Sequence, residues 1–223
     1  MAERNEVFFR CGSIVLEGVI EIPDGVDRPS PGAVICHPHP LYGGNMYNNV
    51  TGALKKGLLA RGVVCLRFNF RGTGRSEGSH GEGVDELEDV RAAVDFLSQQ
   101  KLADPEKIIV AGYSFGCWVG LRAASTDRRP TRLIGISPPV DHYDFSFLLG
   151  ELRPKLLMAG DRDFVCSKTK FLRLVEEIPE PKQSSLIPGG DHFHVGREHL
   201  LVTEMNGFLE KYPLHDGRNP SSV

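Results

Sequence analysis

The sequence lacks any long apolar run and any block of like charge. No uninterrupted apolar stretch approaches the roughly 18 residues of a membrane span, and residues 1–6 lack the apolar core of a signal peptide. Acidic and basic residues are interleaved and the net charge is −3, which favours neither nucleic acid nor an anionic membrane surface as a partner. We therefore expect a cytoplasmic protein, a monomer or a homodimer, that binds a small and roughly neutral molecule.

Disulfide and metal-binding cysteine patterns are also missing. The 223 residues contain five cysteines, an odd number, and no Cys-x-x-Cys pair. Two of the cysteines lie inside apolar runs that are typical of strands. We therefore interpret all of them as small core residues in a reducing compartment: Cys11, Cys36, Cys65, Cys117 and Cys166.

The sequence does contain a regular alternation of strand and helix patterns. An opening antiparallel ribbon is expected at residues 7–22, and β-rich runs follow at 33–36, 63–70, 107–111, 132–137, 155–159 and 183–187. Helical patterns lie between them at about 47–60, 84–100, 115–125, 167–177 and 197–211. This alternation predicts an α/β fold with a mostly parallel, twisted sheet covered by helices on both faces. Residues 1–212 are expected to form one domain, and 213–223 a polar, frayed tail.

The pattern Gly-x-Ser-x-Gly occurs twice, and only one copy has the context of a nucleophile. Residues 112–116 follow an apolar strand directly and lead directly into a helical stretch. Such a turn projects its serine hydroxyl above the sheet, beside the free amides of the helix N-terminus. The second copy, residues 74–78, lies in a glycine-rich segment that no strand enters directly. We therefore predict that Ser114 is a nucleophile and that Ser76 is a loop residue.

A nucleophilic serine needs an imidazole to take its proton and a carboxylate to orient that imidazole. Asp161 and Asp163 follow the strand at 155–159, and His192 and His194 follow the last predicted strand. In an open α/β sheet the site lies beyond the carboxyl ends of the parallel strands. The sequence therefore predicts a site that brings together a serine, an aspartate and a histidine, in that chain order.

These ordered motifs resemble the α/β-hydrolase superfamily. Within it the chain looks most like small bacterial, dienelactone-hydrolase-like serine hydrolases that carry His-Pro-His-Pro-Leu-Tyr-Gly-Gly, here residues 37–44. The resemblance covers about residues 7–212. It implies an α/β-hydrolase fold with a minimal cap and a serine triad that needs neither cofactor nor metal. Carried over by position, it makes Asp163 the acid and His192 the base, with Asp161 a turn former and His194 a surface or loop residue.

The segment at 37–44 also offers donors for an oxyanion hole. Pro38 and Pro40 have no N–H, so the segment donates from His39, from Leu41 or from a later residue. The resemblance favours the amide of His39 and adds, as the second donor, the amide of Phe115, which follows the serine.

Other polar groups have competing interpretations. His37 and His39 could ligate the metal of a metallohydrolase, but no further ligand follows at conventional spacing. Arg71 and Arg75 could bind an acidic substrate group, although pairing with nearby acidic residues is the simpler interpretation. The acidic residues at 85–89 are interpreted as the solvated first turn of a helix.

The predicted reaction is the hydrolysis of carboxylic esters of small acyl groups through an acyl-enzyme. An acyl-CoA thioester would use the same triad, and a catalytically silent binding module is the alternative of another class. Only residues 138–154 separate two strands between which this superfamily usually carries its cap, and they are too few for a helical cap domain. Their apolar side chains form either a lip beside Ser114 or a helical turn on the core: Tyr143, Phe145, Phe147, Leu148 and Leu149.

Overall fold

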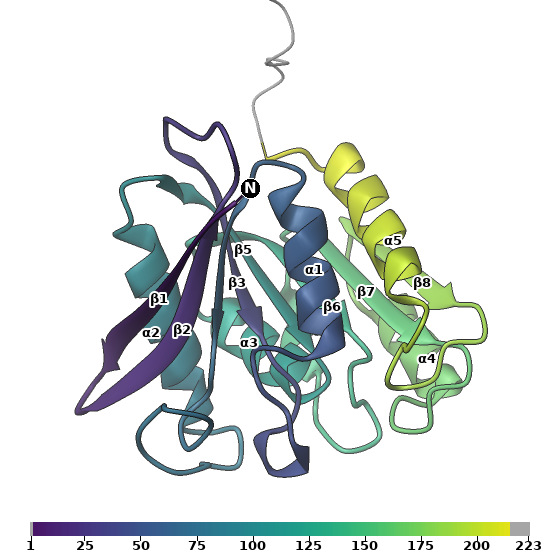
Figure 1. The fold of residues 1–223 in the computed structure, drawn as a ribbon. Coiled ribbons are helices and arrows are strands. Elements are labelled where there is room, and N and C mark those ends of the chain that lie inside the picture. Colours follow the sequence, from purple (N-terminus) through teal and green to yellow (C-terminus); the bar gives the residue numbers. More distant parts are fainter. Residues whose placement is uncertain (1, 215–223) are drawn as a thin grey trace, which may run out of the picture.

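The computed structural model describes residues 2–214, which are built on one eight-stranded sheet (Figure 1). In chain order the strands are β1 (Glu3–Cys11), β2 (Ile14–Ile22), β3 (Ser30–Cys36), β4 (Val64–Phe68), β5 (Ala103–Tyr113), β6 (Pro130–Ile136), β7 (Lys155–Gly160) and β8 (Lys182–Ile187). Across the sheet they run β1-β2-β4-β3-β5-β6-β7-β8. β2 pairs antiparallel with β1 and β4, and the remaining pairs are parallel. The predicted architecture, including the opening ribbon, is confirmed.

Helices cover both faces of the sheet. On one face lie α1 (Asn49–Leu59) and α5 (Glu198–Lys211), and on the other lie α2 (Glu86–Ser98), α3 (Phe115–Ser125) and α4 (Lys168–Glu177) (Figure 1). Successive side chains of a strand therefore enter different cores: Ile35 of β3 packs on the α1 side, while Val34 packs on the α2 side. Burial on both faces explains the apolar runs of the central parallel strands, whereas the edge strand β8 is half-buried and largely polar.

The element boundaries lie close to the expected ones, and the differences have local causes. β5 begins at Ala103, before several polar residues, because Ala103 and Asp104 pair with the start of β3. α1 begins after Asn48, whose side chain accepts the N–H of Val50 at 2.9 Å and so caps the helix. The strand expected at 63–70 ends at Phe68, which leaves the next residues to form the loop beside the site.

The end of the described chain is attached to the fold. Arg132 donates hydrogen bonds to the carbonyls of Tyr212 and Pro213, and Leu214 packs against the core beneath α1 and α5. The expectation of a frayed tail from residue 213 is therefore wrong for its first two residues, and 215–223 lie outside the described part of the chain. No helix of residues 2–214 is long and apolar enough to cross a membrane.

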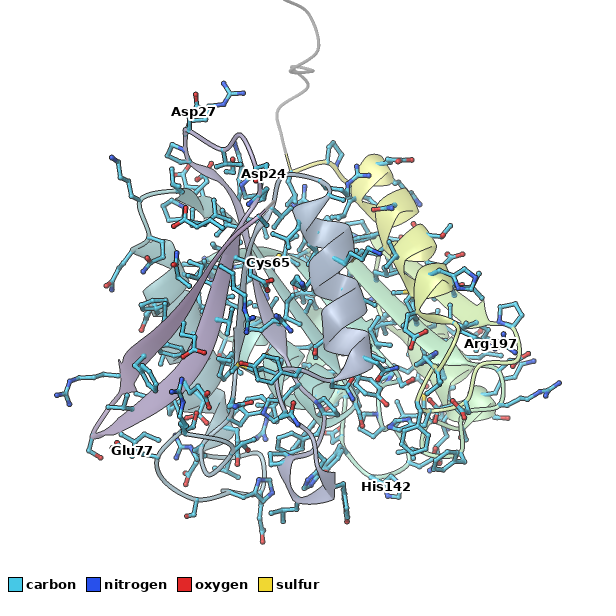
Figure 2. All side chains as sticks on the ribbon, viewed as in Figure 1. Asp24, Asp27, Cys65, Glu77, His142 and Arg197 are labelled. Atoms are coloured by element: carbon cyan, nitrogen blue, oxygen red, sulfur yellow. The ribbon has the colours of Figure 1, made fainter. Side chains whose placement is uncertain are left out.

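The five cysteines are all buried with free thiols, as their sequence context predicts, and Cys65 can be seen inside the fold in Figure 2. The carboxyl ends of the parallel strands lie together at the lower edge of Figure 1, where the loops after β3, β6, β7 and β8 converge. His142, on the loop after β6, marks the same edge in Figure 2. The predicted site residues are found along this edge.

Candidate active site

Ser114 occupies a sharp turn between β5 and α3. Its φ of 54° and ψ of −120° are uncommon for a residue with a side chain, and its N–H donates to the carbonyl of Ile136 at 2.9 Å. A Cβ at Gly112 would lie 2.1 Å from the carbonyl oxygen of Gly116, and one at Gly116 would lie 2.3 Å from that of His37. Both glycines of the motif are therefore required by close backbone approach.

Three side chains from three loops form one hydrogen-bonded chain. The hydroxyl of Ser114 lies 2.9 Å from Nε2 of His192, and Nδ1 of His192 lies 2.9 and 3.0 Å from the two carboxylate oxygens of Asp163. Each of the three residues is less than a tenth exposed. A proton on Nδ1 that is donated to Asp163 leaves Nε2 free to accept the proton of Ser114. The structure thus brings together the serine, the aspartate and the histidine that the sequence selected.

Asp163 is held as a carboxylate by several donors. Its Oδ1 accepts the N–H groups of Val165 and Cys166, each at 2.9 Å. Burial alone would raise the pKa of Asp163, but the hydrogen bond and charge of His192, a hydrogen bond from Ser137 and the amide of Cys166 together lower it. Asp161, by contrast, is exposed and lies outside this set of contacts, in keeping with its interpretation as a turn residue.

A buried pair behind Asp163 was not found from the sequence. Ser137 follows β6 directly with a φ of 45°, and its hydroxyl lies 2.8 Å from Nε2 of His194. The expectation of a surface or loop residue is confirmed in that His194 lies in a loop, and it is wrong for the surface, because the side chain is completely buried and burial lowers its pKa. The Asp-His-x-His spacing was the available signal, since Oδ1 of Asp191 accepts the N–H of His194 and turns the ring inward.

The backbone of the histidine loop is fixed by Tyr113, another residue that sequence reasoning missed. Its hydroxyl donates to the carbonyl of His192 at 2.6 Å. Because Tyr113 precedes Ser114 directly, one rigid strand end positions both the hydroxyl of Ser114 and the loop that carries the imidazole. The only sequence signal was the aromatic residue inside the Gly-x-Ser-x-Gly pattern.

Two backbone amides near Ser114 are available to an incoming oxygen. Within residues 2–214, neither the N–H of His39 nor that of Phe115 donates to a protein acceptor, and Phe115 is the first residue of α3. The N–H of Leu41 is instead directed to Nδ1 of the His39 side chain, at 3.3 Å. Of the two donors that the sequence left open, the geometry therefore favours His39.

His37 is engaged by the backbone at both ring nitrogens. Its Nε2 accepts the N–H of Phe70 at 3.0 Å, and its Nδ1 lies 2.6 Å from the carbonyl of Pro38. Burial lowers the pKa of His37 to about 4, so the ring is neutral. Nε2 fastens the loop after β3 to the segment that follows β4, and Nδ1 is engaged within its own loop, so the metal-ligand interpretation of His37 and His39 does not fit this geometry. Within the described chain, no group of three or more His, Cys, Asp or Glu side chains could hold a metal ion.

A model of the alpha/beta hydrolase family matches residues 34–165. The chain belongs to this family. It is 37% identical over 188 residues to the uncharacterized protein RP471 of Rickettsia prowazekii, covering 81% of this chain and 79% of that protein. An alpha-beta serine hydrolase homologue from Coxiella burnetii is 32% identical, with a TM-score of 0.82 over 93% of this chain and 96% of that one. XC6422 from Xanthomonas campestris, an a/b serine hydrolase without a lid, is 28% identical, with a TM-score of 0.85 over 99% and 97%.

The glycine-rich loop of this hydrolase has a structural role. Ser76 is buried, where its hydroxyl accepts the N–H of Glu17 and donates to the carbonyl of Asn69, so the loop interpretation is confirmed. Arg71 pairs with Asp89 at 2.7 Å, and the guanidinium of Arg75 pairs with Glu6 and Glu17. Both arginines therefore hold the loop in place, as the simpler interpretation predicts.

The acidic start of α2 is only partly solvated. Asp85 and Glu88 are exposed, but Glu86 and Asp89 are completely buried, which corrects the expectation for the segment 85–89. Glu86 accepts two backbone N–H groups of the preceding loop at 2.7 Å and lies 2.9 Å from Nδ1 of His80. Buried carboxylates need hydrogen-bond partners, and the partners of Glu86 and Asp89 belong to the loop beside the site. The two carboxylates therefore hold that loop in place.

The hydrolase has a cleft of about 690 Å³ directly over Ser114. The residues that line it are Pro38, His39, Tyr42, Gly43, Gly44, Asn48, Tyr113, Ser114, Phe115, Pro139, His142, Tyr143, Phe164, Val165, His192 and Phe193. None of these described residues is a lysine, arginine, aspartate or glutamate. The cleft therefore suits an uncharged molecule with an apolar or aromatic part.

The short segment between β6 and β7 contributes both to the lip of the cleft and to the core, the two roles that the sequence leaves open. Tyr143 lines the cleft, whereas Phe145 and Leu148 are buried in the core. Leu148 belongs to the 3₁₀ turn η2 (Ser146–Gly150), which among the described residues is the only regular element between β6 and β7. Among the described residues of this segment no helical cap is present, which is consistent with a site that is open to solvent.

Proposed function

We propose that this hydrolase cleaves uncharged carboxylic esters of small acyl groups through an acyl-enzyme. Ser114 attacks the acyl carbonyl while its proton passes to Nε2 of His192. The C–O bond to the alcohol then breaks, and His192 returns the proton to the leaving oxygen. In the second half, His192 takes a proton from water, the resulting hydroxide attacks the acyl group, and Ser114 leaves with the proton.

The hydrogen-bonded chain from Ser114 through His192 to Asp163 carries this proposal. Asp163 keeps its charge despite burial and so stabilises the imidazolium that forms at each step. The amides of His39 and Phe115 supply the two donors for the tetrahedral oxyanion. One such donor is typically worth about 2.7–4 kcal/mol of transition-state stabilisation.

An ester is favoured over acyl-CoA by the charge of the cleft. Coenzyme A carries several phosphate groups, and anions of that kind are normally bound by lysine or arginine. The cleft lining has neither. A silent binding module is disfavoured by Ser114, because holding a residue in a sparsely populated backbone region costs about 1–3 kcal/mol that such a module has no reason to retain.

The finer relationship to small dienelactone-hydrolase-like enzymes with the segment 37–44 stands as part of the proposal, supported by the fit of that segment to an oxyanion loop. Cytoplasmic location is proposed on the strength of the five free thiols, which suit a reducing compartment. A state no larger than a homodimer is likewise proposed.

Labelling with a fluorescent fluorophosphonate, followed by peptide mapping, tests the nucleophile and the reaction class together. We expect the label on Ser114, and we expect none on the Ser114→Ala variant. Ser76→Ala is the matched control, since it alters the other Gly-x-Ser-x-Gly serine, and it should label like the wild type. A label on another residue would refute the assignment of the nucleophile, and no label at all would favour the binding module.

A further inference from the structure

Two exposed phenylalanines lie beside the imidazole of His192. Phe164 is 68% exposed and Phe193 is 54% exposed. Their ring centroids lie 5.9 and 6.1 Å from the ring of His192 and 5.7 Å from each other. Two large apolar rings that stay in water lose the favourable free energy of burial. Such a pair at the mouth of a cleft therefore indicates that a bound molecule covers the two rings.

The sheet order places this pair on one defined side of Ser114. Phe164 follows β7 and Phe193 follows β8, and both strands lie on the β6 side of β5. The loop of His39 follows β3, which is the neighbour of β5 on the opposite side. An ester bound at Ser114 therefore meets the oxyanion loop on one side and the two phenylalanines on the other.

The direction of proton transfer decides which part of the ester faces the pair. His192 must hand its proton to the oxygen of the departing alcohol, so that oxygen lies next to Nε2. The rings of Phe164 and Phe193 surround the same imidazole, whereas the carbonyl oxygen lies at the amides of His39 and Phe115. The alcohol, and not the acyl group, therefore extends over the phenylalanines.

We propose that Phe164 and Phe193 form a leaving-group site that selects esters of uncharged aromatic alcohols. The inference rests on the proposed ester hydrolysis and specifies its alcohol. An aromatic ring gains more binding free energy from this pair than an aliphatic ring of the same size. Offset and edge-to-face contacts between aromatic rings stabilise the complex in addition to the burial of apolar surface. The described residues that line the cleft include no lysine or arginine to pair with an anionic alcohol.

The decisive comparison is 2-phenylethyl acetate against 2-cyclohexylethyl acetate. The two esters share the acyl group, and their alcohols have nearly the same size and acidity, so the chemical step is matched. The cyclohexyl ring is the more hydrophobic, and a site that works by burial alone would prefer it. We expect kcat/KM to favour the phenyl ester by about fivefold. A ratio of one or below in the wild type would overturn the proposal.

Leucine variants assign the preference to the pair. Phe164→Leu and Phe193→Leu should each reduce the phenyl-to-cyclohexyl ratio, and the double variant should bring it to one or below. Phe8→Leu is the matched control, because Phe8 is also half exposed but lies on β1 and is not among the residues that line the cleft. It should keep the wild-type ratio. A double variant that keeps this ratio would overturn the role of the pair.

Fluorophosphonate labelling of Ser114 separates this inference from the proposed function. Wild-type protein that is labelled but shows no aromatic preference refutes only the leaving-group site. Wild-type protein that is not labelled refutes the proposed hydrolysis, and the site with it. The leucine variants should also be labelled on Ser114, and thermal unfolding of each variant shows whether its fold is intact.

A negatively charged ester tests the restriction to uncharged alcohols. The acetate of 4-(2-hydroxyethyl)benzoate adds a carboxylate to the phenyl ester without changing the reacting carbon. We expect its kcat/KM to fall at least to the value of the cyclohexyl ester, since the anion loses hydration and gains no partner. Faster hydrolysis than that of the neutral phenyl ester would overturn the restriction to uncharged alcohols.

Discussion

Replacing Asp163 by asparagine should preserve the fold and reverse the proton arrangement of His192. Oδ1 of Asp163 accepts the amides of Val165 and Cys166, and an asparagine oxygen in the same place accepts both. The new NH₂ group then takes the place of Oδ2, which lies 3.0 Å from Nδ1 of His192. An amide nitrogen only donates, and Oδ1, which also lies 2.9 Å from Nδ1, already accepts two backbone N–H groups, so the exchange favours Nδ1 as an acceptor.

The size of the effect follows from this reversal. With Nδ1 accepting, the proton of the neutral imidazole sits on Nε2, which lies 2.9 Å from the hydroxyl of Ser114 and can no longer receive its proton. The same reversal in other serine triads lowers kcat by about 10⁴-fold, equivalent to about 5.5 kcal/mol of transition-state stabilisation. We expect a loss of that order for Asp163→Asn.

The assay is the steady-state hydrolysis of p-nitrophenyl acetate, with thermal unfolding of each variant measured in parallel. Asp161→Asn is the matched control, because Asp161 is exposed and joins the loop through its backbone N–H, which donates to Ile187 at 3.1 Å. Its kcat should stay within about twofold of the wild type, as for a surface substitution. The reasoning is refuted if Asp163→Asn folds normally and loses less than tenfold, or if Asp161→Asn loses as much.

Ser76→Ala should keep most of the activity, yet urea titration should show a loss of about 1–3 kcal/mol in unfolding free energy, because the buried N–H of Glu17 loses its acceptor. The kcat/KM of the wild type should fall in acid, since an imidazolium cannot accept the proton of Ser114; a profile that stays flat would contradict a histidine base. Among p-nitrophenyl esters, kcat/KM should peak at acyl chains of a few carbons. Each buried methylene contributes ~0.8 kcal/mol of binding free energy, and an open cleft offers a longer chain little further surface against which to bury. A steady rise to fatty-acid length would indicate a tunnel. Burial lowers the pKa of His37 from 6.5 in the unfolded chain to about 4 in the folded protein. As the pH falls below 6.5, the unfolded chain takes up a proton that the folded protein does not. The free energy of unfolding therefore decreases toward pH 4, by about 2 kcal/mol at pH 5. His37→Gln, which retains an acceptor for the N–H of Phe70, should remove that part of the pH dependence in urea titrations at pH 7 and pH 5.

The sequence was most informative where local pattern and fold agree. Most of the predicted strands are short apolar runs, and parallel strands bring their carboxyl ends to one edge whatever their order across the sheet. That is why Ser114, Asp163 and His192 could be placed together without knowing the strand order. The order itself, with β3 and β4 exchanged relative to the chain, could not be derived from composition or periodicity.

The sequence does not predict which polar residues are buried, because their burial depends on how segments of the chain fold against one another. His194 and Ser137 are 57 residues apart, and no local pattern links them. Acidic residues are common in the solvated first turn of a helix, which is why the sequence pattern predicts an exposed Glu86. Its burial depends on the loop before α2, whose glycines bring two N–H groups close to the carboxylate.

The direction of the hydrogen bonds behind Asp163 can be deduced from what that carboxylate requires. Burial makes His194 neutral, so its ring has one N–H. Within the described residues its Nδ1 has no partner, and a proton there would be a buried donor left unpaired, at a cost of about 1–3 kcal/mol. The proton therefore belongs on Nε2 and is donated to the hydroxyl of Ser137. That hydroxyl is then free to donate its own proton to Asp163, which lowers the pKa of the carboxylate and keeps it charged beside His192.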